Sequence, residues 1–209
     1  DVSDLFVDSS FKPFCNKCVR AIKVPGMAGK SKGFFEKMEK YALEIGMKGL
    51  GYFKVTEDYK YLGPIDKFLN DDQRLELKNR CQLEPDCVLY FIADSKKEAP
   101  RLAGMIRQEV AKRMDLIDQD SFRFCFVVDF PMYEQDEETG KIIFTHNPFS
   151  MPQGGLEALT TKNPLDILAY QYDIVVNGIE LSSGAVRNHD LDIMVKAFEI
   201  AGYTEEDLK

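Results

Sequence analysis

The chain has 209 residues, of which 44% are hydrophobic, and it contains 15 Phe and 9 Tyr but no Trp. This is enough apolar material for one large or two small packed cores, which excludes intrinsic disorder as the overall description. The longest uncharged apolar stretch, residues 87–93, is far shorter than the roughly 20 residues needed to cross a bilayer, and no basic-then-apolar signal opens the chain. The sequence therefore predicts a soluble protein with no membrane partner.

Charge is distributed unevenly along the chain. The net charge is −8 and the pI is near 4.9, which argues against a protein that wraps nucleic acid. Residues 1–117 contain 21 Lys and Arg against 18 Asp and Glu, whereas residues 118–209 contain 6 against 17. Such asymmetry indicates two domains with different partners, and the polar run at residues 115–121 is the expected seam. We therefore predict one domain at residues 1–117 and a second at residues 118–209.

The cysteines predict a reducing compartment. There are five of them, an odd number, in a chain long enough to fold without disulfides, so we expect free thiols and a cytoplasmic location. Cys15 and Cys18 have the spacing of half a zinc site, and Cys81 with Cys87 would have to supply the other half. The second pair is separated by five residues, and Cys87 begins an apolar segment. We expect no structural zinc, and an unrelated zinc-binding protein is the alternative that metal analysis would reveal.

The first domain is predicted to alternate strands with helices. The expected strands are residues 19–24, 51–55 and 87–93, and the expected helices are residues 31–46, 72–82 and 95–114. In the first helix, apolar side chains recur at three- and four-residue spacing from Phe34 to Ile45, and Gly46 suits the left-handed turn that ends a helix. Residues 87–93 are apolar throughout, which is typical of a strand buried on both faces. This order of elements predicts an α/β or α+β module.

The second domain is predicted to be an antiparallel sheet backed by helices. The expected strands are residues 122–130, 141–146, 170–177 and 179–187, and the expected closing helix is residues 189–201. The acidic turn at residues 134–140 indicates a hairpin between the first two strands, and Asn177-Gly178 indicates a second hairpin. Thr204 and the acidic residues after it resemble the start of another helix, so we expect both ends to be cut from a longer chain. The predicted fold class is α+β.

Polar side chains within these strands are candidates for chemistry. Asp173 and Glu180 lie seven residues apart on either side of the Asn177-Gly178 turn. This spacing can bring two carboxylates together on adjacent strands, where they can bind Mg²⁺ and a polyphosphate. Arg187 ends a strand that is otherwise apolar or small, and it can offer a planar fork to a carboxylate or phosphate. Residues 182–185 lack bulk, which would let a flat ligand lie against the strand backbone.

His146 completes this polar set. Only His189 remains in the chain, and two imidazoles are too few for a histidine-based metal site. Each candidate also has a structural alternative. Carboxylates are usually solvated, an arginine at a strand end usually forms a surface ion pair, and a histidine before Asn-Pro is usually a turn residue. Composition and spacing alone leave both interpretations open.

Three ordered segments of the second domain closely resemble the bacterial type of aspartyl-tRNA synthetase. They read FVVDFPM at residues 126–132, THNPFSMP at residues 145–152 and AYQYDIVVNGIELSSGAVRNH at residues 169–189. The first domain is similar to the GAD domain inserted in that family, through GPI at residues 63–65, KFL at residues 67–69 and IADSKK at residues 92–97. The resemblance implies a GAD-like α/β insertion domain, followed by part of a class II synthetase antiparallel sheet with flanking helices.

The resemblance also implies roles for the candidate residues. Arg187 would grip the β-carboxylate of the substrate aspartate, and His146 would be a further residue of the aspartate pocket. Glu180 would bind ATP and Mg²⁺, with Asp173 as its companion at the metal. The implied enzyme activates L-aspartate with ATP to aspartyl-adenylate, transfers it to tRNA, uses Mg²⁺ with ATP, and forms a homodimer at full length.

The chain departs from the family in two places, and it lacks some of its parts. Asn147 stands where the family often has a second histidine, and Ser182-Ser183-Gly184 stands where it has three glycines. The anticodon-binding domain, an arginine-bearing motif before the insertion, and a terminal glycine-arginine motif are absent. On this resemblance we expect an internal fragment that is inactive by itself, because the phosphate-neutralising arginines are missing. The alternative is a noncatalytic GAD-type module that binds RNA or protein, similar to part of an amidotransferase.

Overall fold

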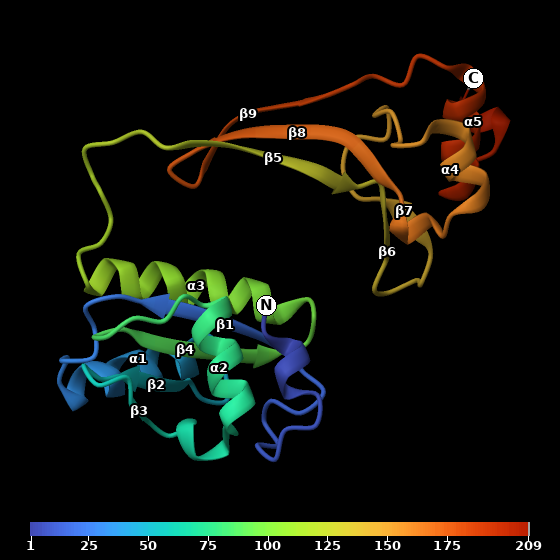
Figure 1. The fold of residues 1–209 in the computed structure, drawn as a ribbon. Coiled ribbons are helices and arrows are strands. Elements are labelled where there is room, and N and C mark those ends of the chain that lie inside the picture. The colour runs from blue at the N-terminus through green and yellow to red at the C-terminus, as the bar shows by residue number, and fades with distance from the viewer. Residues whose placement is uncertain (209) are drawn as a thin grey trace. The chain divides into compact units, whose positions relative to one another are not determined.

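The structure, a computed structural model, describes residues 1–208. Its contacts divide the chain into two compact units, Asp1–Asp118 and the residues from Gln119 onward. Both units combine helices with antiparallel strands, as Figure 1 shows, which confirms the predicted α+β class. The identity of the first unit as an insertion domain, and of the second as part of a catalytic domain, stays a prediction.

The first unit contains a four-stranded sheet and three α-helices. The strands are β1 (Cys18–Val24), β2 (Gly51–Val55), β3 (Tyr61–Leu62) and β4 (Val88–Asp94), and the helices are α1 (Lys32–Glu44), α2 (Asp71–Arg80) and α3 (Glu98–Arg113). Short 3₁₀ turns occupy Ser3–Phe6 and Asp66–Phe68. The strand order is β1-β4-β2-β3, and every pairing is antiparallel. This excludes the α/β alternative for the unit, and β3 is a strand that the sequence did not predict.

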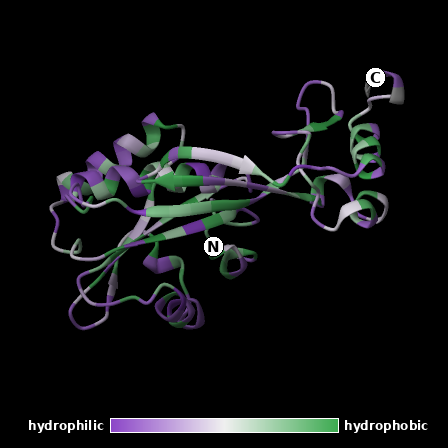
Figure 2. Ribbon diagram, turned by 90° about the horizontal axis from the view of Figure 1, so that it is seen from above, coloured by the Kyte–Doolittle hydropathy of each residue, from purple (hydrophilic) through white to green (hydrophobic). Residues whose placement is uncertain are grey.

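Strand β4 is buried on both faces, as predicted, because it supplies alternate residues to two cores. Leu89 and Phe91 belong to one core, which is closed by the N-terminal segment and by Leu77 of α2. Val88, Tyr90 and Ile92 belong to the other core, which is closed by α1 and α3. Successive side chains of a strand point to opposite faces, so an unbroken apolar run is required where both faces are covered. In Figure 2 the helices carry bands of hydrophilic and hydrophobic residues, as one-sided packing requires.

The second unit contains two small sheets and two α-helices. The strands are β5 (Phe124–Pro131), β6 (Tyr133–Gln135), β7 (Ile142–Phe144), β8 (Leu168–Val176) and β9 (Ile179–Ala185), and the helices are α4 (Gly155–Thr161) and α5 (Leu191–Ile200). Further 3₁₀ turns lie at Pro164–Asp166 and Glu205–Leu208. The larger sheet has the order β5-β8-β9, and β6 pairs with β7. The Asn177-Gly178 hairpin between β8 and β9 is therefore confirmed.

One predicted hairpin is wrong. Residues 122–130 and 141–146 were expected to pair, but β5 pairs with β8 instead, and the partner of β7 is the short strand β6. Pro131 ends β5, and the next residue, Met132, donates its backbone N–H to Ile167 O at 2.8 Å. Beyond that point Tyr133 is buried, and its hydroxyl donates to Ala197 O of α5 at 2.9 Å. The buried Met132-Tyr133 step thus separates β5 from the acidic turn.

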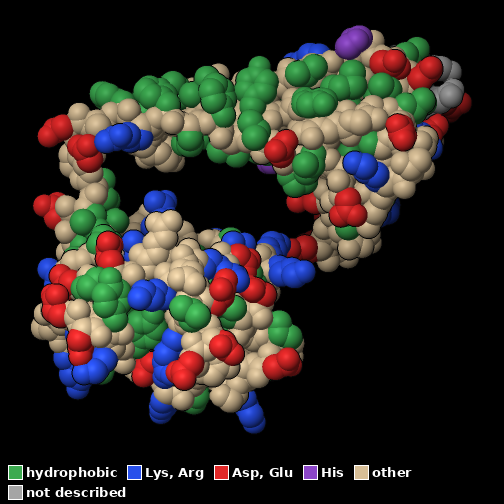
Figure 3. Space-filling view, in the orientation of Figure 1, with side chains coloured by type: hydrophobic (Ala, Val, Ile, Leu, Met, Phe, Trp, Pro, Cys, Tyr) green, Lys and Arg blue, Asp and Glu red, His purple; other side chains and the backbone are tan. Residues whose placement is uncertain are grey.

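Much of the β5-β8-β9 sheet is exposed and apolar. Figure 3 shows hydrophobic side chains gathered along this sheet. Phe124 and Phe126 are 64% and 65% exposed, and Leu181 is 63% exposed. The described core of the unit lies elsewhere, around Met132, Tyr133 and Ala197, where α5 packs. Across residues 1–208, no helix combines the length and the apolar character needed to cross a membrane.

Gly63 allows a close backbone approach in the first unit. A Cβ atom added there would lie 2.5 Å from Tyr52 O and 2.7 Å from Phe53 Cα of β2. Both contacted atoms belong to the backbone, so no side-chain rotation relieves the overlap. The glycine therefore fixes how closely the segment after β3 approaches β2.

We predict that Gly63→Ala lowers the free energy of unfolding by about 1–3 kcal/mol, the usual cost of overpacking. The matched control is Gly104→Ala in α3, where an added Cβ meets nothing within 4 Å. That change should be neutral or stabilise by about 0.5–1 kcal/mol, because alanine favours a helix interior. Urea denaturation of both variants measures the difference. Equal midpoints for the two variants would contradict the prediction.

Candidate functional site

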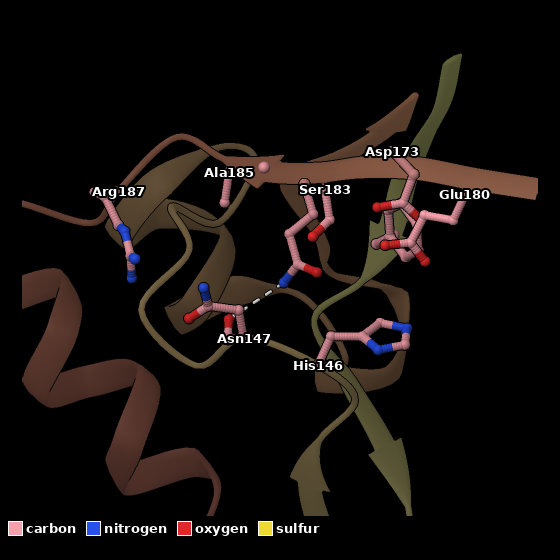
Figure 4. A pocket seen from close by; sticks show the side chains of 10 residues that line it. His146, Asn147, Asp173, Glu180, Ser183, Ala185 and Arg187 are labelled. Atoms are coloured by element: carbon pink, nitrogen blue, oxygen red, sulfur yellow. Dashed lines mark hydrogen bonds between the residues drawn. The ribbon is translucent and has the colours of Figure 1, made fainter. Parts of the chain in front are cut away.

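A pocket of about 430 Å³ lies in the second unit, against β8 and β9. Its lining includes the four residues singled out from the sequence: His146, Asp173, Glu180 and Arg187. The other lining residues are Phe130, Asn147, Gln171, Ser183, Gly184 and Ala185. The structure therefore brings the four candidates together in one cavity, as Figure 4 shows.

The pairing of β8 with β9 explains why these side chains share a face. Gln171 lies opposite Ala185, and Asp173 lies opposite Ser183. Residues directly opposite each other in an antiparallel pair point to the same face, and so do residues two apart on one strand. The pocket face of the hairpin is therefore polar, although the strands are mostly apolar in sequence.

Glu180 reaches this face because the register is irregular. Ile174 lies opposite Ser182, but the next residue, Val175, lies opposite Glu180, so Leu181 has no partner across the pair. A regular ladder would place Glu180 and Ser183, three residues apart, on opposite faces. Because Leu181 is unpaired, Glu180 and Ser183 face the same side of the sheet, as happens at a β-bulge that redirects a side chain. The sequence predicted that the two carboxylates meet, but it did not reveal the irregularity on which the meeting depends.

Arg187 and His146 enter the pocket from outside the regular strands. Arg187 follows the end of β9 and forms an isolated bridge with Ser150. His146 lies in the loop after β7, and its ring stands edge-on to Phe130, with centroids 5.2 Å apart. Figure 4 shows Arg187 at one end of the pocket and Asp173 with Glu180 at the other. The arrangement separates a cationic end from an anionic end.

The charges at both ends are available to a ligand. Among the described residues, no side chain forms an ion pair or hydrogen bond with the charged groups of Arg187, Asp173 or Glu180. A guanidinium with free donors binds a carboxylate or phosphate, and two neighbouring carboxylates suit a hard cation such as Mg²⁺. Within residues 1–208, no group of three or more His, Cys, Asp or Glu side chains is placed to hold a metal without other ligands.

The small residues of β9 face both sides of the strand. Residues 182–185 were expected to leave room for a flat ligand; Ser183, Gly184 and Ala185 do line the pocket, and the binding of such a ligand stays a prediction. Gly184 also has a structural role, because it lies opposite Tyr172, where an added Cβ would lie 2.6 Å from Tyr172 Cε2 and 2.8 Å from its hydroxyl oxygen. Tyr172 and Gly184 lie one residue from Asp173 and Ser183, so their side-chain positions belong to the opposite face. The glycine accommodates a tyrosine ring there, a pairing known to stabilise glycine in sheets.

Sequence reasoning missed two side chains of the pocket. Gln171 is only 9% exposed, and its Nε2 donates to Asn147 O at 3.2 Å. A lone glutamine between tyrosines in an apolar strand was the available signal. Phe130 was taken only as part of a strand, but the register of β5 shifts between Val128 and Phe130, where Asp129 has a φ of 60°. After this shift Phe130 lies opposite Ala169, on the face of Gln171.

Comparison with known proteins gives a consistent picture. A family model described as tRNA synthetases class II (D, K and N) matches residues 6–209. The aspartate–tRNA ligase of Streptomyces avermitilis is 53% identical over 209 residues, covering 100% of this chain and 36% of the relative. The aspartate–tRNA ligase of Streptomyces griseus is 54% identical over 209 residues, covering 100% of this chain and 35% of the relative.

A third relative carries a broader name. The aspartate–tRNA(Asp/Asn) ligase of Ehrlichia chaffeensis is 49% identical over 211 residues, covering 99% of this chain and 36% of the relative. The chain thus spans roughly a third of the length of the curated relatives it matches.

We predict that Gly184→Ala destabilises the second unit by about 0.5–1 kcal/mol, because the half-exposed Tyr172 ring has to turn away from the new methyl group and loses its cross-strand contact. The same change should cost less than about 0.5 kcal/mol when Tyr172→Ala has already removed the ring. Ser182→Ala, on the same strand, is the control and should be nearly neutral. Denaturant titration of the single and double variants measures the coupling. Equal costs in both backgrounds would show that the tyrosine is not the reason for the glycine.

Proposed function

Because the chain belongs to the class II tRNA synthetases of the D, K and N group, we propose that it is an internal part of an aspartate–tRNA ligase. The whole enzyme would activate L-aspartate with ATP to aspartyl-adenylate and transfer the aspartyl group to tRNA. The observation that carries the proposal is the pocket on the β8–β9 face, which has a free guanidinium at one end and two free carboxylates at the other. Both kinds of relative, the aspartate–tRNA ligases and the aspartate–tRNA(Asp/Asn) ligase, carry aspartate as the amino acid in their names.

In this proposal Arg187 selects the amino acid. Its planar fork donates two parallel hydrogen bonds to the β-carboxylate of aspartate. Asparagine would present an amide NH₂ to donors that need acceptors, which leaves buried polar groups unpaired and disfavours its binding. His146, held beside Phe130 on the same face, completes the aspartate pocket.

Asp173 and Glu180 would serve the nucleotide. Their carboxylate oxygens are ligands of the type that Mg²⁺ accepts, and Mg²⁺ sites commonly combine one or two carboxylates with substrate phosphates. The pair therefore fits the ion, and Mg²⁺ bound with ATP would neutralise charge on the phosphates. The separation of this end from Arg187 keeps the nucleotide carboxylates away from the substrate β-carboxylate, which they would repel.

The chain's own contribution to the reaction is positioning. An oxygen of the α-carboxylate of aspartate attacks the α-phosphorus of ATP. The bond from that phosphorus to the oxygen that bridges it to the β-phosphorus breaks, and pyrophosphate leaves. Arg187 and His146 hold the amino acid, and Asp173 and Glu180 orient the polyphosphate, so that the two reacting atoms are in line. A ribose hydroxyl of tRNA then displaces AMP. We further propose that the whole enzyme is a cytoplasmic homodimer.

The first test concerns Arg187. In the full-length enzyme, Arg187→Lys should lower kcat/KM for aspartate at least about a hundredfold, roughly 3 kcal/mol, while ATP use stays nearly intact. Lysine keeps the charge but loses the paired donors. Aspartate-dependent pyrophosphate exchange, measured with each substrate varied, gives the result. Arg101→Lys in α3 is the matched control, since it lies outside the pocket and should change nothing. Equal damage to aspartate and ATP kinetics by Arg187→Lys would contradict the assignment.

The second test concerns Glu180. Glu180→Gln keeps the shape of the side chain but removes its charge. It should raise the KM for ATP, and the Mg²⁺ concentration needed for exchange, about tenfold or more, with little effect on the KM for aspartate. Titrating Mg²⁺ at fixed ATP measures the change. Glu157→Gln in α4 is the control for loss of an acidic charge outside the pocket. If Glu180→Gln instead weakens aspartate alone, Glu180 does not serve the nucleotide.

A further inference from the structure

The loop that carries His146 is tied to the sheet by main-chain hydrogen bonds over most of its length. Met151 N donates to Val186 O at 2.8 Å, and Met151 O accepts from Tyr170 N at 2.9 Å. Asn188 N donates to Phe149 O at 2.8 Å. From Phe149 onward the loop therefore lies between the start of β8 and the segment after β9, almost as an additional strand. Backbone pairing of this kind fixes the loop regardless of its side chains.

The portion nearest the pocket lacks such main-chain support. Thr145 N donates to Met132 O at 3.1 Å, but for residues 146–148 no described main-chain bond reaches β8 or β9. The bonds that Asn147 makes to Phe149 N and Ser150 N stay within the loop. The one described bond from this portion to the sheet comes from a side chain, since Gln171 Nε2 donates to Asn147 O at 3.2 Å. The dashed line in Figure 4 marks this bond.

We propose that Gln171 is a positioning residue, which holds His146 in the pocket by tying Asn147 to β8. Gln171 is 9% exposed and lies two residues before Asp173 on the pocket face. The carbonyl oxygen of Asn147 can only accept a hydrogen bond, so the Gln171 amide must turn its NH₂ group toward it, which fixes the orientation of the amide. The bond acts where main-chain pairing stops, one residue from His146, and it keeps that imidazole against Phe130.

The position of His146 can be measured without activity. His146 and His189 are the only histidines of the 209-residue chain, so the chain gives two sets of imidazole C–H NMR signals, one from each residue. The ring current of Phe130, 5.2 Å away, makes the His146 signals sensitive to position. Gln171→Met keeps the length of the side chain but cannot donate. It should shift or broaden the His146 signals and leave those of His189 unchanged.

The matched control is Gln153→Met. Gln153 Nε2 also ties the same loop to the sheet, donating to Asp129 Oδ1 at 2.7 Å, but Gln153 does not line the pocket. This variant should leave both histidine signals in place. If Gln171→Met does not fold, Gln171→Glu serves instead, since its ionised carboxylate also lacks the donor. Unchanged His146 signals in the folded variant, or equal changes in the control, would overturn the proposal.

The consequence for catalysis rests on the proposed function. In the full-length enzyme, Gln171→Met should raise the KM for aspartate about fivefold to tenfold, with kcat and the KM for ATP changed less than about twofold. In a His146→Ala background the same change should have almost no further effect, because it acts through His146. An undiminished effect in that background would overturn the positioning role. Absence of aspartate-dependent exchange in the wild-type enzyme would instead refute the proposed function, and the NMR result would stand by itself.

Discussion

The pocket of the second unit depends on one alignment, the antiparallel pairing of β8 with β9. This pairing decides which side chains face the cavity, because opposite residues share a face and successive residues do not. Gln171 and Asp173 reach the pocket through the regular part of the ladder, and Glu180 reaches it only because Leu181 is unpaired. Arg187 and His146 are then added at the edges by segments that hydrogen-bond to the same hairpin or lie beside it. A polar site is thus assembled on strands that are otherwise apolar.

The two units show how differently an apolar strand can be used. In the first unit β4 lies between two cores, and its residues from Val88 to Ile92 are buried. In the second unit β5 is as apolar, yet Phe124 and Phe126 are mostly exposed. Composition predicts that a strand is able to be buried, but burial requires a covering layer. Helix α5 packs against Tyr133, through its residue Ala197, rather than over β5.

The sequence predicted those features that depend on local chemistry. Asn177-Gly178 correctly placed the β8–β9 hairpin, and the apolar run after Cys87 correctly indicated a strand buried on both faces. The features that were predicted wrongly or missed depend on partners that are distant in the sequence. The predicted pairing of β5 with residues 141–146 was wrong, because the point at which the chain turns after β5 depends on the burial of Met132 and Tyr133. The contact between Gly184 and Tyr172 was not predicted, because these two partners across the hairpin are twelve positions apart in sequence. Gln171 was missed because its bond to Asn147 joins positions 24 residues apart, and its place between two tyrosines was the only local signal.

The register of the β8–β9 hairpin limits how its length can change in evolution. Between Asp173 and Glu180, loss or gain of a single codon would exchange the two faces of one strand relative to the other, sending a carboxylate from the cavity to the apolar side. A change of two codons at the turn would shorten or lengthen both strands equally and preserve the arrangement. Between the two carboxylates, length variation is therefore restricted by parity rather than by size, whereas loss of the unpaired Leu181 itself would make the ladder regular and keep both carboxylates on the cavity face.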